Sequence, residues 1–470
     1  MSSGASLIVR ITIVVCALGL VALFTRRVRP YTLALGFGAT AVQWMLAYIA
    51  MIGVGKWIGE GLFALTALAP IAIGFLSQRF ARKESGAWSS GLVNGMVNVL
   101  IVGSVVGGKD AQAAVHEAIY WTLGIVAGSS GLAALGGIVA RRNEPREGVL
   151  PPPICLFAIV ASSTLFLLLV TGGLVTGLEA GLAVPDWPNT FGHNMLMYPI
   201  SEMKGGVYYE HAHRLFGMLV GLNALVLAAL CWRHESRGWV RVLATLMLVM
   251  VCGQGLLGGL RVTGSLTLEQ NPSLLQPSTA LAIVHGIFGQ IVFAVLITVA
   301  SVTTATWLSP SHAIHTPAGN SARLWALIAP IILLVQLFLG AAFRHLQVTP
   351  TDAAKAISYP AWAMHGHLGF AMVAVIVVMI AASRLAGIGR SDALARPLAV
   401  CATTMVSIVS LQVVLGFVAL GAVLMRRGAA IPLWELVSTT AHQVIGALLL
   451  AAAVQGTVWS RRLLAGSSAA

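Results

Sequence analysis

The sequence predicts an all-α integral membrane protein: two pseudo-symmetric four-helix transmembrane bundles, preceded by about five extra transmembrane helices. Hydrophobic residues make up 58% of the 470 residues and charged residues only 9%, whereas a soluble domain has about 25% charged residues. Apolar runs long enough to cross a bilayer recur along the whole chain. A pattern of histidines, glutamines and glycines occurs twice in the last two-thirds, which indicates a duplicated unit.

The apolar runs predict thirteen membrane-spanning helices. The expected spans are residues 6–25, 31–52, 60–77, 88–107, 113–140, 153–178, 209–232, 240–260, 277–303, 322–343, 361–383, 397–421 and 435–459. The fourth run is the least regular, because Asn94 and Asn98 interrupt it.

The chain divides into three expected domains. Residues 1–150 form an N-terminal membrane domain of about five spans, to which the sequence assigns no function. The charged, Pro-rich segment 141–153 marks its end. Residues 151–310 and 311–470 then form the first and second four-helix units.

Basic residues outnumber acidic ones by 28 to 15. They lie in short clusters between the apolar runs, so we expect a lipid environment and no nucleic-acid partner. If alternate loops face the cytoplasm, the inside loops hold 18 of the 28 basic residues, which follows the positive-inside rule. The sequence therefore predicts a multi-pass protein of the cell (inner or plasma) membrane, with its N-terminus outside and its C-terminus inside.

The two C-terminal units share three features at nearly constant offsets. A His-x-His pair occurs at His211/His213 and again at His365/His367. Single histidines follow on the fourth helix of each unit, at His285 and His442. A Gln-x-x-Leu-Gly pattern completes the set, at residues 254–258, 336–340 and 412–416.

Four of these histidines are candidate haem ligands: His213, His285, His367 and His442. Each lies roughly 7–12 Å from the outer end of its helix, at 1.5 Å per residue. Strongly polar residues inside a bilayer are costly and are functional candidates. Two facing imidazoles at one depth are what a bis-histidine haem needs. The alternative is that each histidine only bonds a neighbouring carbonyl group.

Small residues follow these histidines by four positions, at Gly217, Gly289, Ala371 and Gly446. Such residues share a helix face with the histidine. They would leave room for a flat macrocycle, or would serve helix packing. Because residues two apart point in nearly opposite directions, His211 and His365 are left to orient neighbours, to bond propionates or to lie in an interface.

Zinc is a weaker use of the histidines, because the sequence has no H-E-x-x-H motif. The five cysteines lie within or beside apolar runs without metal-ligand spacing, so neither a disulfide framework nor a Cys-ligated metal is expected.

Glu210 is the candidate catalytic residue. It lies one helical turn before His213, and could act as acid, base or cation stabiliser beside an iron site. The second unit has Met364 at that place, which suggests one reactive haem and one that only carries electrons or supports the structure. The alternative for Glu210 is a carboxylate favoured by the helix dipole.

Arginines lie at the outer ends of the same helices, where haem propionates would emerge, and Arg214 is a candidate cofactor-binding residue among them. The others are Arg261, Arg344, Arg426 and Arg427. Arginine pairs well with carboxylates, although interfacial snorkelling explains the same positions.

At these residues the sequence resembles the haem A synthase family over about residues 151–470. The motifs that carry the resemblance are the outer-loop segment 181–188 with Pro185-Asp186-Trp187-Pro188, the Glu210-x-x-His213-Arg214 helix start, and the three further histidines. The loop itself could form a lid over the first unit.

The resemblance implies oxidation of the C8 methyl group of haem O to the formyl group of haem A, for assembly of a haem-copper oxidase. It implies substrate haem O at His213 and His285, a cofactor haem b at His367 and His442, and a catalytic Glu210. Haem O synthase and oxidase assembly factors are the candidate partners, and the electron donor is open.

Two features depart from that family. Many members carry a cysteine pair in the first outer loop, where this chain has none, so thiol chemistry there is in doubt. The N-terminal spans also lie outside the family's usual core. The alternatives to a haem oxidase are a di-haem b-type membrane cytochrome, such as a quinol oxidoreductase, and a transporter.

Overall fold

In the computed structural model, residues 27–53, 55–109, 111–142, 144–146, 148–263, 278–309, 313–348, 358–428 and 430–465 are described. They form an all-helical protein apart from one short hairpin, and contain twelve helical segments that are long and apolar enough to span a membrane. Twelve expected spans are thereby confirmed. The thirteenth, residues 6–25, lies outside the described residues.

The N-terminal part forms four of these spans. Its elements are α2 (Pro30–Met51), α3 (Lys56–Leu65), α4 (Leu68–Phe80), α5 (Ala87–Asn98), η1 (Val99–Ile101), α6 (Val102–Val106) and α7 (Ala111–Ala140). α3 and α4 together make one span, as do α5, η1 and α6. Close glycine contacts join α4 to α7, because a Cβ at Gly74 would clash with the carbonyl oxygen of Ala133.

The two asparagines that interrupt the fourth span are buried and form hydrogen bonds with side chains of α2. Asn94 donates to Oγ1 of Thr40 at 3.0 Å and to Oε1 of Gln43 at 2.7 Å. Asn98 also donates to Gln43, at 2.8 Å, and accepts from Nε1 of Trp44 at 2.9 Å. Polar groups in an apolar core are tolerated when they are hydrogen-bonded in this way.

The C-terminal part contains eight longer helices. They are α8 (Pro153–Gly177), α9 (Gly205–His234), α10 (Gly238–Thr263), α11 (Thr279–Val302), α13 (Gly319–His345), α14 (Ala361–Ser391), α15 (Arg396–Met425) and α16 (Leu433–Leu463). Short helices lie between them: η2 (Met195–Met197), η3 (Ile200–Glu202), α12 (Ala305–Leu308) and η5 (Ala393–Ala395). A hairpin pairs β1 (Asn189–Thr190) with β2 (His193–Asn194), so that Thr190 lies opposite His193.

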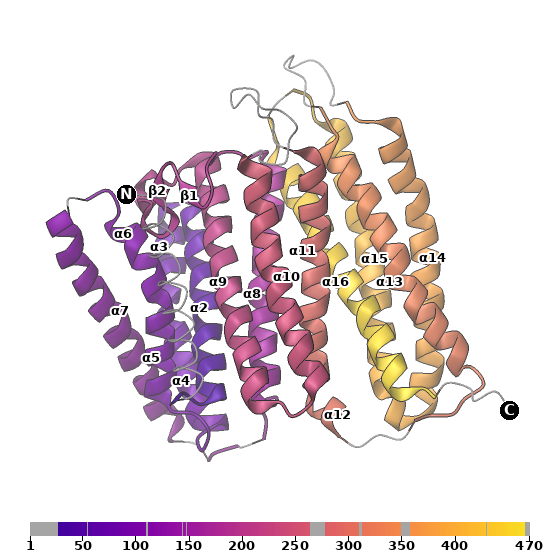
Figure 1. Ribbon diagram of the computed structural model, residues 1–470, viewed down its shortest axis with the longest axis horizontal. Coiled ribbons are helices and arrows are strands. Elements are labelled where there is room, and N and C mark those ends of the chain that lie inside the picture. The colour runs from indigo at the N-terminus through magenta and orange to yellow at the C-terminus, as the bar shows by residue number, and fades with distance from the viewer. Residues whose placement is uncertain are drawn as a thin grey trace, which may run out of the picture.

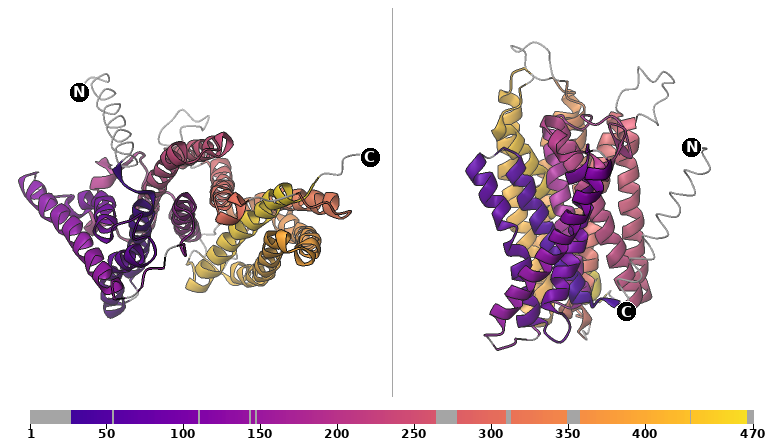
Figure 2. Two further views of the ribbon diagram at one scale, coloured as in Figure 1. Left: turned by 90° about the horizontal axis from the view of Figure 1, so that it is seen from below. Right: turned by 90° about the vertical axis from the view of Figure 1, so that its left-hand side faces the viewer.

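The C-terminal helices pack in two closed sets of four. α8 and α10 each contact both α9 and α11, while α14 and α16 each contact both α13 and α15. The sets meet through contacts of α16 with α8 and α11, and of α11 with α13. Figure 1 shows the helices running side by side, and Figure 2 shows an elongated slab with the N-terminal helices at one end.

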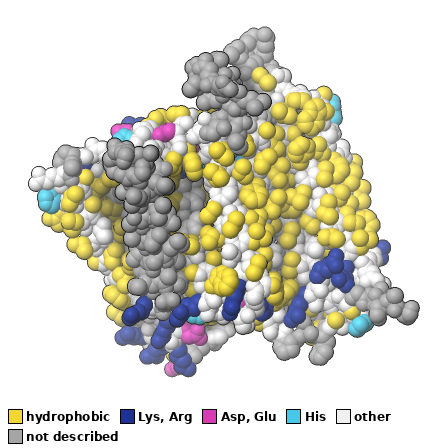
Figure 3. Space-filling model, in the orientation of Figure 1, with side chains coloured by type: hydrophobic (Ala, Val, Ile, Leu, Met, Phe, Trp, Pro, Cys, Tyr) yellow, Lys and Arg dark blue, Asp and Glu magenta, His cyan; other side chains and the backbone are white. Residues whose placement is uncertain are grey.

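Basic side chains gather along one edge of the slab, at the lower ends of the helices in Figure 3. The outer-loop hairpin β1–β2 lies at the opposite edge (Figure 1). This distribution agrees with a cytoplasmic lower edge, and the hydrophobic band between the two edges is where lipid would lie.

Candidate functional site

The four candidate histidines lie on alternate helices, near the end opposite the basic edge. His213 is eight residues after the first residue of α9, His285 six after that of α11, His367 six after that of α14, and His442 nine after that of α16. All four side chains are half-buried. Helices of this pitch rise 1.5 Å per residue, so the imidazoles lie at similar depths.

The second pair, His367 and His442, is in ring contact. The ring centroids are 6.3 Å apart and the planes are at 87°. Two imidazoles that bind one metal at about 2.0 Å per nitrogen have centroids about 6 Å apart. At this separation the two imidazoles would be able to hold one iron between them.

The first pair consists of His213 and His285, which lie close enough to interact electrostatically. Nδ1 of His213 is 3.0 Å from Oγ1 of Thr171 on α8. Nδ1 of His285 is buried and has no hydrogen-bond partner among the described residues. The two members of this pair are therefore held differently.

Each candidate histidine contacts a glycine on the helix before it. A Cβ at the glycine would lie 2.8–3.1 Å from Cε1 of the imidazole, for the pairs Gly172–His213, Gly258–His285, Gly340–His367 and Gly416–His442. Any larger residue would displace the ring. This role of the glycines was not predicted, although the repeated Gln-x-x-Leu-Gly pattern contains three of them, Gly258, Gly340 and Gly416.

The glutamines of the same pattern hold the histidine helices. Gln254 donates to the backbone oxygen of His285 at 2.8 Å, and Gln336 to that of His367 at 3.0 Å. Nε2 of Gln336 is also 3.0 Å from Nδ1 of His367. Nε2 of Gln412 lies 3.4 Å from Nε2 of His442, a contact that must give way before that nitrogen binds a metal.

The small residues after the histidines do not all leave open space. A Cβ at Gly289 would lie 3.0 Å from Nε2 of Gln254, and one at Gly446 would lie 3.2 Å from Nε2 of Gln412. At these two positions helix packing explains the glycine. A Cβ at Gly217, beside His213, would meet nothing within 4 Å in the described structure.

Glu210 and Arg214 form a buried ion pair on α9. Nε of Arg214 is 3.1 Å from Oε1 of Glu210. The other guanidinium nitrogens of Arg214 donate to the backbone oxygens of Val184, Asp186 and Asn189, at 2.7–3.0 Å. The donors of Arg214 therefore hold Glu210 and the outer loop, and a contact of Arg214 with a haem propionate stays a prediction.

The outer loop is docked on the first four-helix set. The Asp186 carboxylate accepts from the backbone N–H groups of Phe191 and Gly192, both at 2.7 Å, and so closes the β1–β2 turn. The Trp187 ring lies on Gly259 of α10, where a Cβ would clash with the indole. The loop therefore packs against α9 and α10 near their outer ends.

The two remaining histidines of the His-x-His pairs have different surroundings. His211 is fully buried, with Nδ1 3.1 Å from Oγ1 of Thr190 and its ring 5.0 Å from that of Tyr198. Burial, and secondarily Glu202, raise the pKa of the Tyr198 phenol above 10.0, so this ring stays neutral. His365 is exposed. His211 thus fastens the loop to α9, and His365 has no such role.

Three outer arginines line the same end of the molecule. Arg261 lies against Gly181 of the loop, and its Nε is buried with no hydrogen-bond partner among the described residues. Arg344 donates to the backbone oxygen of Thr176. Arg426 is paired with Glu179 at 3.1 Å and with Glu435 at 2.9 Å. Of the three, Arg261 is the best placed to receive a ligand carboxylate.

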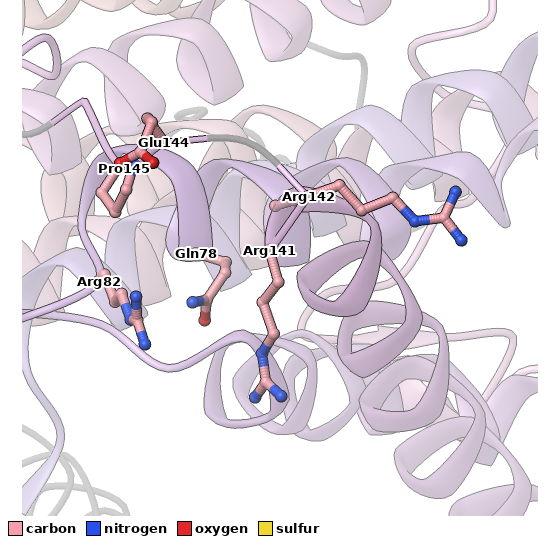
Figure 4. Close-up of a pocket in the computed structure, with 7 residues that line it drawn as sticks. Gln78, Arg82, Arg141, Arg142, Glu144 and Pro145 are labelled. Carbon is pink, nitrogen blue, oxygen red and sulfur yellow. The ribbon is translucent and has the colours of Figure 1, made fainter.

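A polar cavity of about 280 Å³ lies elsewhere, at the basic edge of the N-terminal helices. Figure 4 shows its lining, with Arg82 and Arg141 near Gln78. It contains none of the candidate site residues and lies at the opposite end of the helices.

Comparison with known proteins adds an independent observation. The family described as cytochrome oxidase assembly protein (COX15-CtaA) matches residues 155–454. Haem A synthase of Methylorubrum populi is 31% identical over 180 residues, which cover 35% of this chain and 43% of that protein. Haem A synthase COX15 of Homo sapiens is 31% identical over 141 residues, 23% of this chain and 32% of that protein.

The chain thus matches less than half the length of these curated relatives. No solved structure matches it.

Proposed function

Because the chain belongs to the cytochrome oxidase assembly protein family COX15-CtaA, we propose that it is a membrane oxidoreductase of the haem A synthase type. Its substrate is haem O, and the reaction oxidises the C8 methyl group to the formyl group of haem A. The product serves assembly of a haem-copper oxidase.

One observation carries this proposal: each closed set of four helices contributes two histidines at matched depth, and among the described residues only the first set has a buried carboxylate one helical turn from such a histidine. The buried Glu435 of the second set lies two turns before His442 and is paired with Arg426. Glu210 is 6% exposed and is one turn from His213. Met364 at the equivalent position has no acid–base chemistry. This asymmetry favours one reactive site and one site for electron transfer.

We assign haem O to His213 and His285, and a resident haem b to His367 and His442. The 6.3 Å separation of the second pair, the partnerless Nδ1 of His285 and the open space beside Gly217 support a fit of such groups. A bound haem supplies the redox chemistry, with potentials that its axial ligands set. The described histidines and Glu210 lie in residues 151–310 and 311–470, which we propose as the two pseudo-symmetric haem-binding units.

The chain's own residues orient and enclose the substrate in this proposal. Arg214 keeps the Glu210 carboxylate in place and fastens the outer loop over the site. Glu210 exchanges a proton beside the reacting end of the substrate. Arg261 pairs with a propionate, as a guanidinium readily does.

Replacement of Glu210 tests the proposal. Glu210→Gln keeps an oxygen for Arg214 but removes the ionisable group, so we expect formyl production to fall at least about 100-fold. Haem content should stay near that of the unmodified protein. The measurement is mass identification of the pigments extracted from protein purified from cells that make haem O.

The matched control is Glu202, which is exposed and lies in the segment between α8 and α9. Glu202→Gln should retain activity. Undiminished haem A production by Glu210→Gln would refute the role of Glu210. Recovery of haem b alone from the unmodified protein would favour the di-haem cytochrome, and recovery of no pigment would favour a transporter.

A further inference from the structure

The helix that precedes His213 departs from the pattern of its three counterparts. α10, α13 and α15 each carry a glutamine four residues before the glycine that touches the histidine. α8 carries Leu168 at this position, and has Thr171 next to Gly172. His213 is therefore the one candidate ligand whose helix is not held by a glutamine amide.

Thr171 takes the place of the amide by contacting the ring. Its side chain is fully buried. Oγ1 is 2.9 Å from the backbone oxygen of Leu168 and 3.0 Å from Nδ1 of His213. The Leu168 carbonyl is also a backbone partner of the His213 ring.

These contacts favour a proton on Nδ1 of His213. A carbonyl oxygen can only accept, so the Leu168 oxygen is a suitable acceptor for the hydroxyl proton of Thr171. In that arrangement Oγ1 accepts from the ring, and Nδ1 of His213 is the protonated nitrogen. In a neutral imidazole the other nitrogen, Nε2, keeps its lone pair, which is the form that binds a metal.

We propose that Thr171 is a positioning residue, which fixes the tautomer of His213 and presents its Nε2 to the iron of the haem held by the first pair. The inference rests on the proposed function, because it assumes a haem at this pair. In the first pair, the Thr171 hydroxyl on α8 contacts His213 and Gln254 on α10 holds His285. In the second pair, glutamines on both preceding helices make these contacts.

The test uses the full-length protein purified with its haems. Thr171→Val has nearly the same shape without the hydroxyl, and Thr171→Ser retains the hydroxyl. Thr164→Val is the matched control, since Thr164 is buried on the same helix and, among the described residues, bonds only the backbone oxygen of Val160, at 2.9 Å. Transfer of haem to haem-free myoglobin gives the dissociation rate, and a His213→Ala variant identifies the spectral component of the first pair.

We expect Thr171→Val to speed haem loss from the first pair by roughly tenfold, the lower end of the usual effect of a partner of a metal-bound histidine. Its low-spin spectrum should shift, while the component of the second pair stays unchanged. Thr171→Ser and Thr164→Val should resemble the unmodified protein.

Equal haem loss from Thr171→Val and the unmodified protein would overturn the inference and leave the proposed function intact. So would a defect in Thr171→Ser as large as that in Thr171→Val, because the methyl group would then be the important part. If the unmodified protein binds no haem at the first pair, that result contradicts the proposed function, and the inference about Thr171 fails with it.

Discussion

At the scale of single residues, the most regular feature is the contact between a glycine and an imidazole, which occurs four times. In each case the glycine lies on the preceding helix, so that the ring packs directly against a backbone. Metal ligands must be held within a fraction of an ångström of their working position. If the four histidines bind iron as proposed, the absence of a side chain at these four glycines allows that placement.

Gly258→Ala should displace the ring of His285, because the new Cβ would lie 3.0 Å from its Cε1. We expect haem retention at the first pair to fall about tenfold, as for other losses of ligand positioning. Titration of the purified protein with haem measures the change.

Gly255→Ala is the control for this prediction. Gly255 is on the same helix, and a Cβ there would meet nothing within 4 Å in the described structure. Alanine is favoured over glycine in a helix by up to about 1 kcal/mol, so this variant should be no less stable. Similar haem loss from both variants would contradict the role of Gly258.

The four candidate histidines were recognisable in the sequence, but the residues that contact their rings were not. Depth could be estimated because a helix has a constant rise per residue, which placed His213 and His285 at one level. The register between neighbouring helices has no such rule, so the contact of Gly172 with His213 was not foreseen. For the same reason, the contacts of Arg214 were not predicted. Its guanidinium donates to backbone oxygens of the outer loop, and no periodic sequence pattern indicates that these lie near it.

At the scale of elements, the spans were predictable and the outer loop was not. Apolar runs predicted twelve helices correctly, including the fourth span, where Asn94 and Asn98 both donate to Gln43. The loop between α8 and α9 is instead shaped by single hydrogen bonds, such as those of Asp186. Its fold depends on three-dimensional contacts that a hydropathy pattern does not contain.

Arg214→Lys should loosen this loop while keeping the positive charge. A lysine is a compact charge on a flexible stem and cannot reach Glu210, Val184 and Asp186 together. We expect hydrogen exchange at the backbone amides of Phe191 and Gly192 to become about tenfold faster, which mass spectrometry can measure. Arg233→Lys, at the exposed inner end of α9, should leave exchange at these amides unchanged. Equal exchange rates in both variants would show that Arg214 does not hold the loop.

The turn between α9 and α10 gives a pH-dependent prediction. Hydrogen bonds from Arg237 hold the pKa of Glu235 below its ordinary value of 4.5. A carboxylate with a lowered pKa in the folded state stabilises the fold above pH 4.5, and this contribution disappears as the pH falls through the lowered pKa.

Glu235→Gln should therefore be less stable than the unmodified protein near neutral pH, by about 1 kcal/mol or less because the pair is partly solvated. The difference should vanish in strong acid. Thermal unfolding of both proteins in detergent, followed across the acidic range, provides the measurement. A difference that is independent of pH would show that the charge of Glu235 is not responsible.

At the scale of the whole molecule, the N-terminal helices and the first four-helix set share one core. Trp44 and Tyr48 of α2 both contact Phe216 of α9, with ring centroids 5.8 and 5.9 Å apart. The Tyr208 hydroxyl donates to the backbone oxygen of Tyr48 at 2.6 Å. α9 is also the helix that carries Glu210 and His213, so the N-terminal part supports the candidate site from behind.

Trp44→Ala should weaken this junction. The indole is buried, contacts Phe216 and donates to Asn98, so its loss should lower the free energy of unfolding by about 3 kcal/mol. Trp57→Ala removes an indole that is 84% exposed and should have little effect. Denaturation of the detergent-solubilised protein measures both, and equal losses would show that the α2–α9 contact does not stabilise the fold.

The two four-helix sets are joined at both ends of their helices. Arg426 connects Glu179 of the first set to Glu435 of the second at the outer end, while α11 and α16 are joined near the inner end by Gln455–Thr298 and Trp459–Ser301 hydrogen bonds. Fastening at both ends opposes a hinge between the halves. If each half carries a redox centre, an electron passing between them crosses a gap of constant width, and the exchange rate is set by the architecture rather than by a domain motion.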